Sequence, residues 1–419
     1  MTAPGPVLRP VGGIKGWLLR QGLSLAPFAF AVLRRVRPIL RLGQTYVVTR
    51  HDDVREVFGN DAAFGAPYKA NIDVLTAGEP FFLGMADTPA YHQAVAAMRL
   101  VVLPEDLPLL AQQSEALADQ RVAACGGRID VVAGLVRPVT FDLFAAYFGI
   151  PSPAGARLDL WATRLFEFQF AGSPSDRALR AEVDVMAPAL RAHIDATLAR
   201  RKTDGSITPD VLGRCLALQA EGAPGFTDTQ IRTALLCMIV GGPPQPPMVV
   251  PQAMEQLLRR PKALAMAQAA ASADDDSRLF RIIREAMRFD PLAPALPRQV
   301  VRQVTLARGT RRATPMKPGA RVLVGFASAM MDNRRLPDPA RFDPDRRGHE
   351  YIHFGLGLHE CFGRQINEAT LHLMLKPLLR RTNLRRAAGP EGHLTKAGIF
   401  AERLVVTFDA GPDQTAATG

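Results

Sequence analysis

A single cysteine near the carboxyl end of the chain stands in a setting that suits metal chemistry. Cys361 lies in the segment 354–363, Phe-Gly-Leu-Gly-Leu-His-Glu-Cys-Phe-Gly, with Gly355 and Gly357 before it and Gly363 after it. A thiolate can bind a metal, and nearby peptide N–H groups and the amino end of a following helix stabilise its negative charge. Glycines let the backbone approach a flat cofactor closely. The segment therefore predicts a thiolate ligand, whereas the usual alternative for a lone cysteine is a buried structural residue.

The same segment resembles the haem-binding loop of the cytochrome P450 family. The order Phe354-Gly-x-Gly-x-His359-x-Cys361-x-Gly363 matches that loop at every defining position. The resemblance covers roughly residues 38–408. It implies a mainly α fold, the cytochrome P450 architecture of a helical domain with a minor β region. It also implies a haem b whose iron is bound by Cys361. Thiolate ligation of haem iron favours cleavage of an O–O bond.

The resemblance assigns further side chains to the haem propionates. His92, Arg298 and His359 stand where the family places donors to these two carboxylates, which are costly to bury without a partner. Phe354 and Gly363 complete the cofactor-binding set. For each histidine the alternative is an ordinary surface or core residue. The family often has an arginine one helical turn after the first histidine, and Ala96 occupies that position here.

A charge cluster is implied beneath the cofactor. Glu285 and Arg288 lie three residues apart on a predicted helix. As an isolated pair they would contribute only about 0.2–0.5 kcal/mol. The family, however, places an E-x-x-R motif at this distance before the cysteine and joins it to a later arginine, which corresponds to Arg346. We expect this trio to be structural and to take no part in the chemistry.

A second segment of interest follows a predicted helix in the middle of the chain. Thr227-Asp-Thr-Gln230 forms a capping box, a pattern with which helices often begin, ahead of the apolar run 231–240. Residues 241–247 then read Gly-Gly-Pro-Pro-Gln-Pro-Pro. Each proline inside a helix removes a backbone donor and costs roughly 3 kcal/mol. We therefore predict that the helix breaks at this segment.

The break falls where the family places two proton-delivering side chains. The resemblance implies a helix over the distal face of the haem, in which an acid and an alcohol follow two small residues, here Gly241 and Gly242. Pro244 stands at the position of the acid and Gln245 at that of the alcohol. An amide can hydrogen-bond a peroxide or a water but supplies no proton at neutral pH. Gly241, Gly242 and Gln245 are the candidate catalytic residues.

Three functions are compatible with these residues. The first is a haem-thiolate monooxygenase of the bacterial soluble type, in which water or substrate hydroxyls deliver the protons. The second is a peroxide-consuming enzyme, either a peroxygenase or an isomerase of fatty-acid hydroperoxides, because such relatives need no delivered protons. The third is a haem-binding protein without catalysis. Phenylalanine-rich segments such as 165–170 and the lack of an evident charged clamp predict an apolar substrate, such as a lipid, terpene or steroid.

The composition is that of a folded protein. The 419 residues are 47% hydrophobic and 22% charged, with a mean hydropathy near zero. The four cysteines are widely spaced and form no C-x-x-C pair, which suits a reducing cytoplasm. Basic residues are not interleaved with stacking aromatics, so a nucleic-acid partner is not expected.

The net charge of +11 is unevenly distributed. Residues 1–41 contain seven arginines and lysines and no acidic residue, and the apolar stretch 23–33 between them is too short to span a bilayer. Such a basic arm suits an anionic membrane surface or an acidic partner. The alternative is an ordinary segment packed along the domain. The family's electron donors include ferredoxins with their reductases, and a basic face suits an acidic ferredoxin.

The remaining sequence predicts one mostly helical domain. We expect a basic N-terminal arm over residues 1–41, a single cytochrome P450 domain over 42–408 and a polar tail over 409–419. The local patterns of hydrophobic, β-branched and turn residues predict a strand at 45–50, a helix at 51–58, an irregular loop at 61–90, mainly helix from 91 to 285, and short strands at 300–306 and 321–324.

Overall fold

Two compact units make up the chain. The computed structural model describes residues 7–9, 13–172, 175–205 and 208–409. The first unit comprises residues 1–9, 68–113 and 137–246, and the second comprises 10–67, 114–136 and 247–419. Nearly all of the predicted polar tail lies outside the described residues. The arrangement of arm, single domain and tail stays a prediction.

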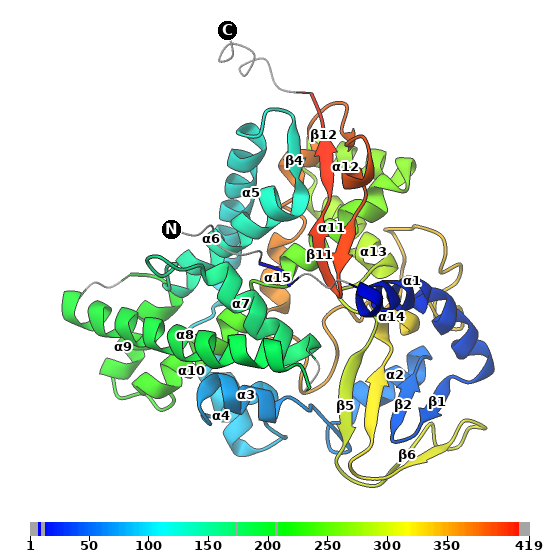
Figure 1. Ribbon diagram of the computed structural model, residues 1–419, viewed down its shortest axis with the longest axis horizontal. Helices are drawn as coiled ribbons and strands as arrows, with labels where there is room; N and C mark the ends of the chain where they lie inside the picture. Colours follow the sequence, from blue (N-terminus) through cyan, green and yellow to red (C-terminus); the bar gives the residue numbers. More distant parts are fainter. Residues whose placement is uncertain (1–6, 10–12, 173–174, 206–207, 410–419) are drawn as a thin grey trace. The chain divides into compact units, whose positions relative to one another are not determined.

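The first unit is helical. Its elements are α3 (Lys69–Thr76), η1 (Phe82–Gly84), α4 (Pro89–Arg99), η2 (Pro104–Asp106), the start of α5 (Leu107–Ala123), α6 (Arg137–Phe148), α7 (Leu158–Phe166), the π-helical turn η4 (Glu167–Ala171), α8 (Arg177–Asp204), α9 (Val211–Ala220) and α10 (Asp228–Gly241). The long helix α8 packs against α3, α7 and α10 (Figure 1).

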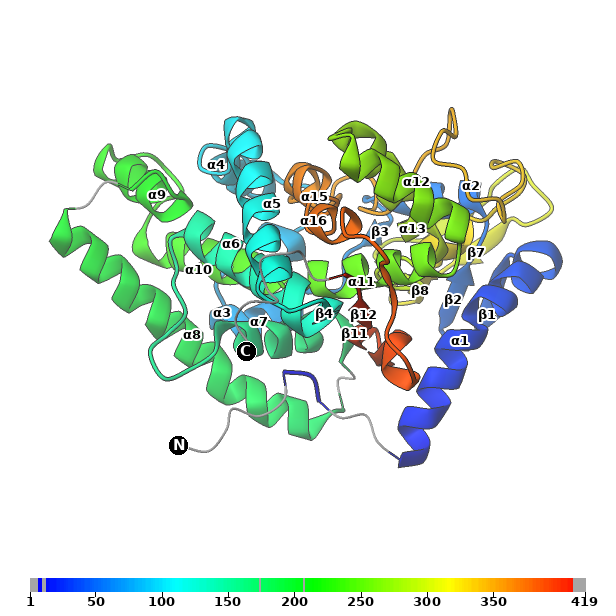
Figure 2. The same ribbon diagram turned by 90° about the horizontal axis from the view of Figure 1, so that it is seen from above.

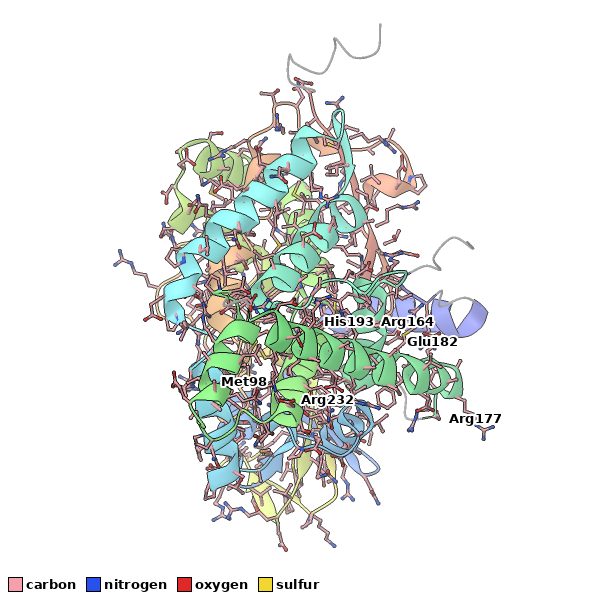
Figure 3. The ribbon with its side chains drawn as sticks, turned by 90° about the vertical axis from the view of Figure 1, so that its left-hand side faces the viewer. Met98, Arg164, Arg177, Glu182, His193 and Arg232 are labelled. Atoms are coloured by element: carbon pink, nitrogen blue, oxygen red, sulfur yellow. The ribbon has the colours of Figure 1, made fainter. Side chains whose placement is uncertain are left out.

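Ion pairs hold the outer side of this helical unit. Figure 3 shows Arg177, Glu182 and His193 along α8, with Arg164 of α7 near Glu182. The Arg164 Nε atom lies 2.8 Å from a Glu182 carboxylate oxygen, and His193 Nε2 lies 2.7 Å from the Pro151 carbonyl oxygen. These contacts fasten α8 to the helix and the loop that it covers.

The second unit holds all the strands and the remaining helices. The helical elements are α1 (Gly13–Val36), α2 (His51–Gly59), the end of α5, the π-helical turn η3 (Val131–Val136), α11 (Pro246–Leu258, of which Pro246 falls in the first unit), α12 (Pro261–Ser272), α13 (Asp276–Phe289), α14 (Phe326–Ala329), α15 (Arg364–Thr370), α16 (Lys376–Leu379) and η5 (Pro390–Gly392). The strands are β1 (Ile39–Leu42), β2 (Thr45–Val48), β3 (Phe64–Gly65), β4 (Arg128–Asp130), β5 (Leu296–Val300), β6 (Val304–Leu306), β7 (Thr314–Met316), β8 (Arg321–Val324), β9 (Arg385–Arg386), β10 (Thr395–Ala397), β11 (Phe400–Arg403) and β12 (Val405–Thr407).

The largest sheet has five strands in the order β1-β2-β8-β5-β3. Its pairs are antiparallel except β2 with β8, whose register sets Val48 opposite Val324. The buried side of the sheet and the buried face of α2, including Val57 and Phe58, share one hydrophobic cluster. The predicted strand at 45–50 and helix at 51–58 are confirmed, and their apolar faces form the core on which the cysteine segment rests.

Two local predictions were wrong in part. Residues 61–90 are not an irregular loop throughout, because they contain β3, α3 and η1. In α3, Ile72 and Leu75 are buried on one face, so a short amphipathic helix lies within a stretch rich in glycine and proline. The predicted strand 300–306 is divided into β5 and β6, and Val301 between them is exposed. The expectation of a mainly α fold with a minor β region is confirmed.

One apolar helical stretch passes the length and composition test for crossing a membrane. It is Val131–Phe148, and it is the one such stretch among the described parts of the chain. Sixty-one per cent of it is buried inside the structure. That burial is the state of a core helix.

Three histidines of the second unit are withdrawn from solvent. Burial lowers the pKa of His349 to about 4, of His353 to about 3 and of His372 to about 4. Around His372, Asp276 acts against the burial and Lys376 acts with it. The folded protein therefore keeps His372 neutral at a pH where the unfolded chain binds a proton. The stability that this difference contributes is fully present above about pH 6.5. It is lost as the pH falls from about 6.5 towards 4, where the folded protein also begins to bind the proton.

We predict that His372→Leu makes the free energy of unfolding less dependent on pH between pH 7 and pH 4. The free energy of unfolding of the native protein should fall by roughly 2–3 kcal/mol more than that of the variant between pH 7 and pH 4. Urea unfolding of both proteins, followed by circular dichroism at several pH values, measures the difference. His393 is exposed, so His393→Leu serves as the control. Parallel pH profiles for native protein and His372→Leu would contradict the assignment.

Candidate functional site

The cysteine segment forms a closed loop in the second unit. The Cys361 peptide N–H donates to the Phe354 carbonyl oxygen at 2.9 Å, and the Glu360 N–H donates to the Gly357 oxygen at 3.1 Å. Immediately after the loop, the Arg364 N–H donates to the Cys361 oxygen at 3.1 Å, and α15 begins. Backbone bonds on both sides therefore fix the position of Cys361.

Two glycines make this loop possible. Gly355 and Gly357 have φ angles of +71° and +77°, which L side chains rarely adopt. A Cβ atom on Gly357 would also lie 2.3 Å from the Phe58 carbonyl oxygen of α2. On the same side, the Leu358 N–H donates to the Asp61 carboxylate at 2.9 Å. The loop is thus seated directly against the end of α2 and the turn that follows it.

Cys361 is a free, half-buried thiol. Burial raises its pKa to about 11, against a smaller lowering by the peptide N–H of Gly363. Burial thus keeps the thiol protonated in the absence of a metal. A metal ion binds the thiolate, so metal binding would release the proton. A free thiol held in a glycine turn would be able to hold the iron of a haem.

Arg298 and His359 come together in the same unit. Arg298 on β5 is buried, and its guanidinium lies 4.9 Å from the centre of the Phe58 ring. Burial lowers the pKa of His359, the nearby charge of Arg298 lowers it further, and Asp61 acts in the opposite direction. Two N–H-bearing side chains therefore lie near each other in the unit that holds the cysteine loop, and their chemistry suits carboxylates.

His92 belongs to the first unit. It lies on α4 and is exposed, with Nε2 2.6 Å from an Asp87 carboxylate oxygen. Its predicted contact with a propionate stays a prediction.

The helix break predicted at residues 241–247 is present. Helix α10 begins at the capping box of Thr227 and Gln230, as predicted, and ends at Gly241. The Gly242 N–H still donates to the Met238 oxygen at 2.9 Å, but helical bonding then stops until α11 begins at Pro246. Prolines 243 and 244 carry no N–H group, which explains the break.

The Gln245 side chain forms a hydrogen bond that stabilises the backbone at this break. In a continuous helix the Gly241 carbonyl would accept from the peptide N–H of residue 245, but that N–H donates to the Gly242 oxygen at 3.1 Å. The Gln245 side-chain amide donates to the Gly241 oxygen instead. The side chain thus replaces a lost backbone bond. Gly241, Gly242 and Gln245 form one local arrangement, and their predicted catalytic role stays a prediction.

The Glu285, Arg288 and Arg346 side chains meet as predicted. Glu285 and Arg288 are fully buried with 2.7 Å between charged atoms, and Arg346 lies 3.3 Å from the same Glu285 oxygen. The Asp343 N–H and the Tyr351 hydroxyl also donate to Glu285, at 3.0 and 2.8 Å. Burial alone would raise the pKa of Glu285, but the bonds from Arg288, Asp343 and Tyr351 hold it below its usual value.

Asp61 and Tyr351 were missed by the sequence reasoning. Each acts through one long-range hydrogen bond, Asp61 to the cysteine loop and Tyr351 to Glu285. Asp61 stands in a stretch that reads as a loop, and Tyr351 lies outside any periodic element. No local signal in the sequence distinguishes either residue.

The cysteine loop, the buried charge cluster and the mainly helical fold are accompanied by a family match. The profile of the family described as Cytochrome P450 matches residues 184–396, which is half of the chain. This chain belongs to the cytochrome P450 family. The P450 is therefore an oxidoreductase of the monooxygenase class, and its cofactor is haem with its iron.

Individual proteins are similar to the P450 in sequence or in fold. The P450 is 26% identical over 425 residues to the mycinamicin IV hydroxylase/epoxidase of Micromonospora griseorubida, covering 94% of this chain and 96% of that one. It is also 42% identical over 85 residues, 20% of this chain and 7% of the other, to a bifunctional dioxygenase–epoxy alcohol synthase of Pyricularia oryzae. The open structure of the cytochrome P450 EryK from S. erythraea has a TM-score of 0.77 at 22% identity, covering 95% of this chain and 99% of that one.

We predict that Glu285→Gln strongly lowers the free energy of unfolding of the P450. The substitution keeps the size of the side chain but removes the charge that Arg288 and Arg346 surround, and breaking a buried pair costs about 3–5 kcal/mol. Urea unfolding measures the loss. Asp184→Asn is the matched control, because Asp184 and Arg180 form an exposed pair 2.8 Å apart and such pairs contribute less than about 1 kcal/mol. Equal effects of the two substitutions would contradict the central role of the cluster.

Proposed function

We propose that this P450 inserts one oxygen atom into an apolar small molecule of the lipid, terpene or steroid kind. The observation that carries the proposal is the closed loop in which the Cys361 N–H binds the Phe354 oxygen, because it presents a free thiol at a fixed place. The haem, when bound, supplies the activation of the oxidant. The hydroxylase/epoxidase of Micromonospora griseorubida supports oxygen insertion as the type of reaction.

Aromatic packing in the first unit supports an apolar substrate. Phe166 and Phe170 lie with ring centres 4.8 Å apart, and Tyr68 meets Phe170 edge-on at 5.2 Å. Phe168 and Phe170 are only half-buried, so this cluster keeps apolar surface available. We propose it as part of the wall that binds the substrate.

The cofactor-binding residues follow from the family pattern and the loop. We propose Cys361 as the ligand of the iron, with Phe354 and Gly363 shaping the loop around it. Arg298, His359 and His92 are proposed as hydrogen-bond donors to the propionates. Arg298 and His359 have the stronger support, because both sit in the unit that holds Cys361.

Proton delivery in this P450 is proposed to differ from that of its family. Pro243 and Pro244 offer neither an acid nor an alcohol, and the Gln245 amide is engaged with the Gly241 carbonyl oxygen. Protons then come from water or from hydroxyl groups of the substrate. Gly241 and Gly242 contribute backbone groups at the break, where the regular helical bonding stops.

The electron source is proposed to be a ferredoxin with its reductase, in the cytoplasm. Bacterial relatives of the monooxygenase class support this, and the net charge of +11 suits an acidic donor.

The helix break also supports a second candidate, a peroxide-consuming reaction. A pre-formed peroxide brings its own oxygen atoms and needs neither electrons nor delivered protons. The partial match to the dioxygenase–epoxy alcohol synthase supports an oxygenation reaction other than simple hydroxylation. The substrate proposed for this candidate is a fatty-acid hydroperoxide, with a peroxygenase reaction or an isomerisation as the outcome.

Substitution of the cysteine tests the ligand. Cys361→Ser should remove the band of the reduced, carbon-monoxide-bound haem that is typical of a thiolate ligand, and with it the activity, because a neutral hydroxyl does not push electron density onto iron. Cys125 is also a free, half-buried thiol, so Cys125→Ser is the control and should keep the band. Retention of the band in Cys361→Ser would refute the assignment.

Substitution of Gln245 separates the two reactions. Gln245→Glu places an ionisable acid at the break, so oxygen-driven turnover should consume less reductant per product, while turnover with a polyunsaturated hydroperoxide should stay unchanged. Gln245→Ala controls for the lost bond to Gly241. Stopped-flow absorbance of the ferric protein with the hydroperoxide alone, and with ferredoxin, reductase and dioxygen, measures both reactions. Rapid consumption without reductant, and no turnover with ferredoxin, would establish the second candidate and refute the first.

A further inference from the structure

Over residues 25–36, the outer face of α1 is apolar. Leu25, Phe28, Val32 and Val36 recur at intervals of three, four and four residues, so they form one stripe along the helix. All four are exposed, and they make up four of the nine large hydrophobic side chains that are exposed among the described residues. Figure 2 shows α1 with one long side turned away from the strands of its unit. We define these four residues as the α1 stripe.

The opposite face of α1 is already packed. Arg34 donates through Nη1 to the Ser328 hydroxyl of α14 at 2.8 Å, and its carbonyl oxygen accepts from Arg50 Nε at 3.1 Å. The helix also contacts β10. The helix is thus anchored through one face to its own unit. The α1 stripe lies on the other face, where no core of that unit covers it.

Exposed basic side chains lie at the carboxyl end of the stripe, where Arg35 and Arg37 are the sequence neighbours of Val36 and Arg41 follows on β1. Arg35, Arg37 and Arg41 are exposed, and no acidic residue occurs in the first 41 positions. Within the described part of the chain, neither Arg35 nor Arg37 forms an ion pair with a carboxylate. An apolar stripe with a rim of arginines is the arrangement with which amphipathic helices lie in the interface of an anionic membrane.

We propose that α1 docks this P450 onto an anionic lipid surface through the α1 stripe and its arginine rim. The apolar side chains enter the boundary between headgroups and acyl chains, and the arginines meet the lipid phosphates. The proposal goes beyond the proposed reaction and does not depend on it.

Two properties favour lipid over a protein partner. A stable protein interface buries about 1,200–2,000 Å² in total, and four side chains along one helix provide far less apolar surface than this. A partner recognised by its charge alone would pair with the arginines but would leave the stripe uncovered. A lipid surface satisfies both the charge and the apolar side chains, and a shallow stripe is sufficient for it.

Flotation of the full-length, haem-loaded protein with lipid vesicles tests the proposal. One set of vesicles is phosphatidylcholine alone, and the other also contains phosphatidylglycerol. The protein should bind the anionic vesicles at least tenfold more strongly, and high salt should reduce that preference. Weak binding that is equal for both vesicle types would overturn the proposal.

Two double variants separate the apolar and charged contributions. Leu25→Ser with Phe28→Ser should lower binding to anionic vesicles at least tenfold, because two large side chains lose their favourable transfer. Arg35→Gln with Arg37→Gln should lower it roughly tenfold and should leave binding to phosphatidylcholine unchanged. Val185 on α8 is 71% exposed, the same as Phe28, so Val185→Ser is the matched control and should bind as the native protein does.

The same proteins exclude the competing occupant. All substituted side chains are exposed, so the far-ultraviolet circular dichroism and the haem spectrum should match those of the native protein. Sedimentation over a range of protein concentrations, without lipid, should show no self-association that depends on Leu25 and Phe28. A dimer abolished by the Leu25→Ser, Phe28→Ser variant would show that a second copy covers the stripe and would overturn the proposal.

Discussion

The buried carboxylate of Glu285 is the constraint on which the rest of the second unit depends. A charge with no access to water is tolerated only when it is fully hydrogen-bonded, and Glu285 receives bonds from Arg288, Arg346, Asp343 and Tyr351. Three of these partners lie in the long irregular segment that precedes the cysteine loop. The carboxylate therefore gives that segment a single conformation although it has almost no regular secondary structure, and the loop starts from a fixed place.

The position of the cysteine loop itself depends on close backbone packing rather than on buried charges. Gly357 approaches the end of α2 so closely that no side chain fits, and Asp61 accepts a hydrogen bond from the next peptide on the same side. Charge organises the approach to the loop, while backbone geometry and close packing organise the loop itself. The thiol that results is approached by the Gly363 peptide N–H and forms no disulfide, which leaves it available to the cofactor that the family carries.

Some of this arrangement could be read from the sequence, and the reason is locality. The cysteine loop, the capping box of Thr227 and Gln230, and the proline break each depend on residues a few positions apart, so the pattern of residue types was sufficient to predict them. The helix α3 was missed because glycine and proline around it mask a short amphipathic pattern. The bond from Asp61 to Leu358 spans 297 positions, and the bond from Gln245 to Gly241 exists only after the helix has broken. Neither leaves a periodic signal.

The surroundings of Gly241 have a consequence for redesign of the substrate range. Its φ angle lies outside the left-handed region, and a Cβ atom placed on it would meet no atom within 4 Å. Neither backbone strain nor crowding therefore requires glycine there, and alanine would favour the helix by roughly 0.5–1 kcal/mol. The chain gives up that stability at the end of α10. A graded series of larger side chains at position 241 would probe the substrate range there, with the neighbouring helix left in place.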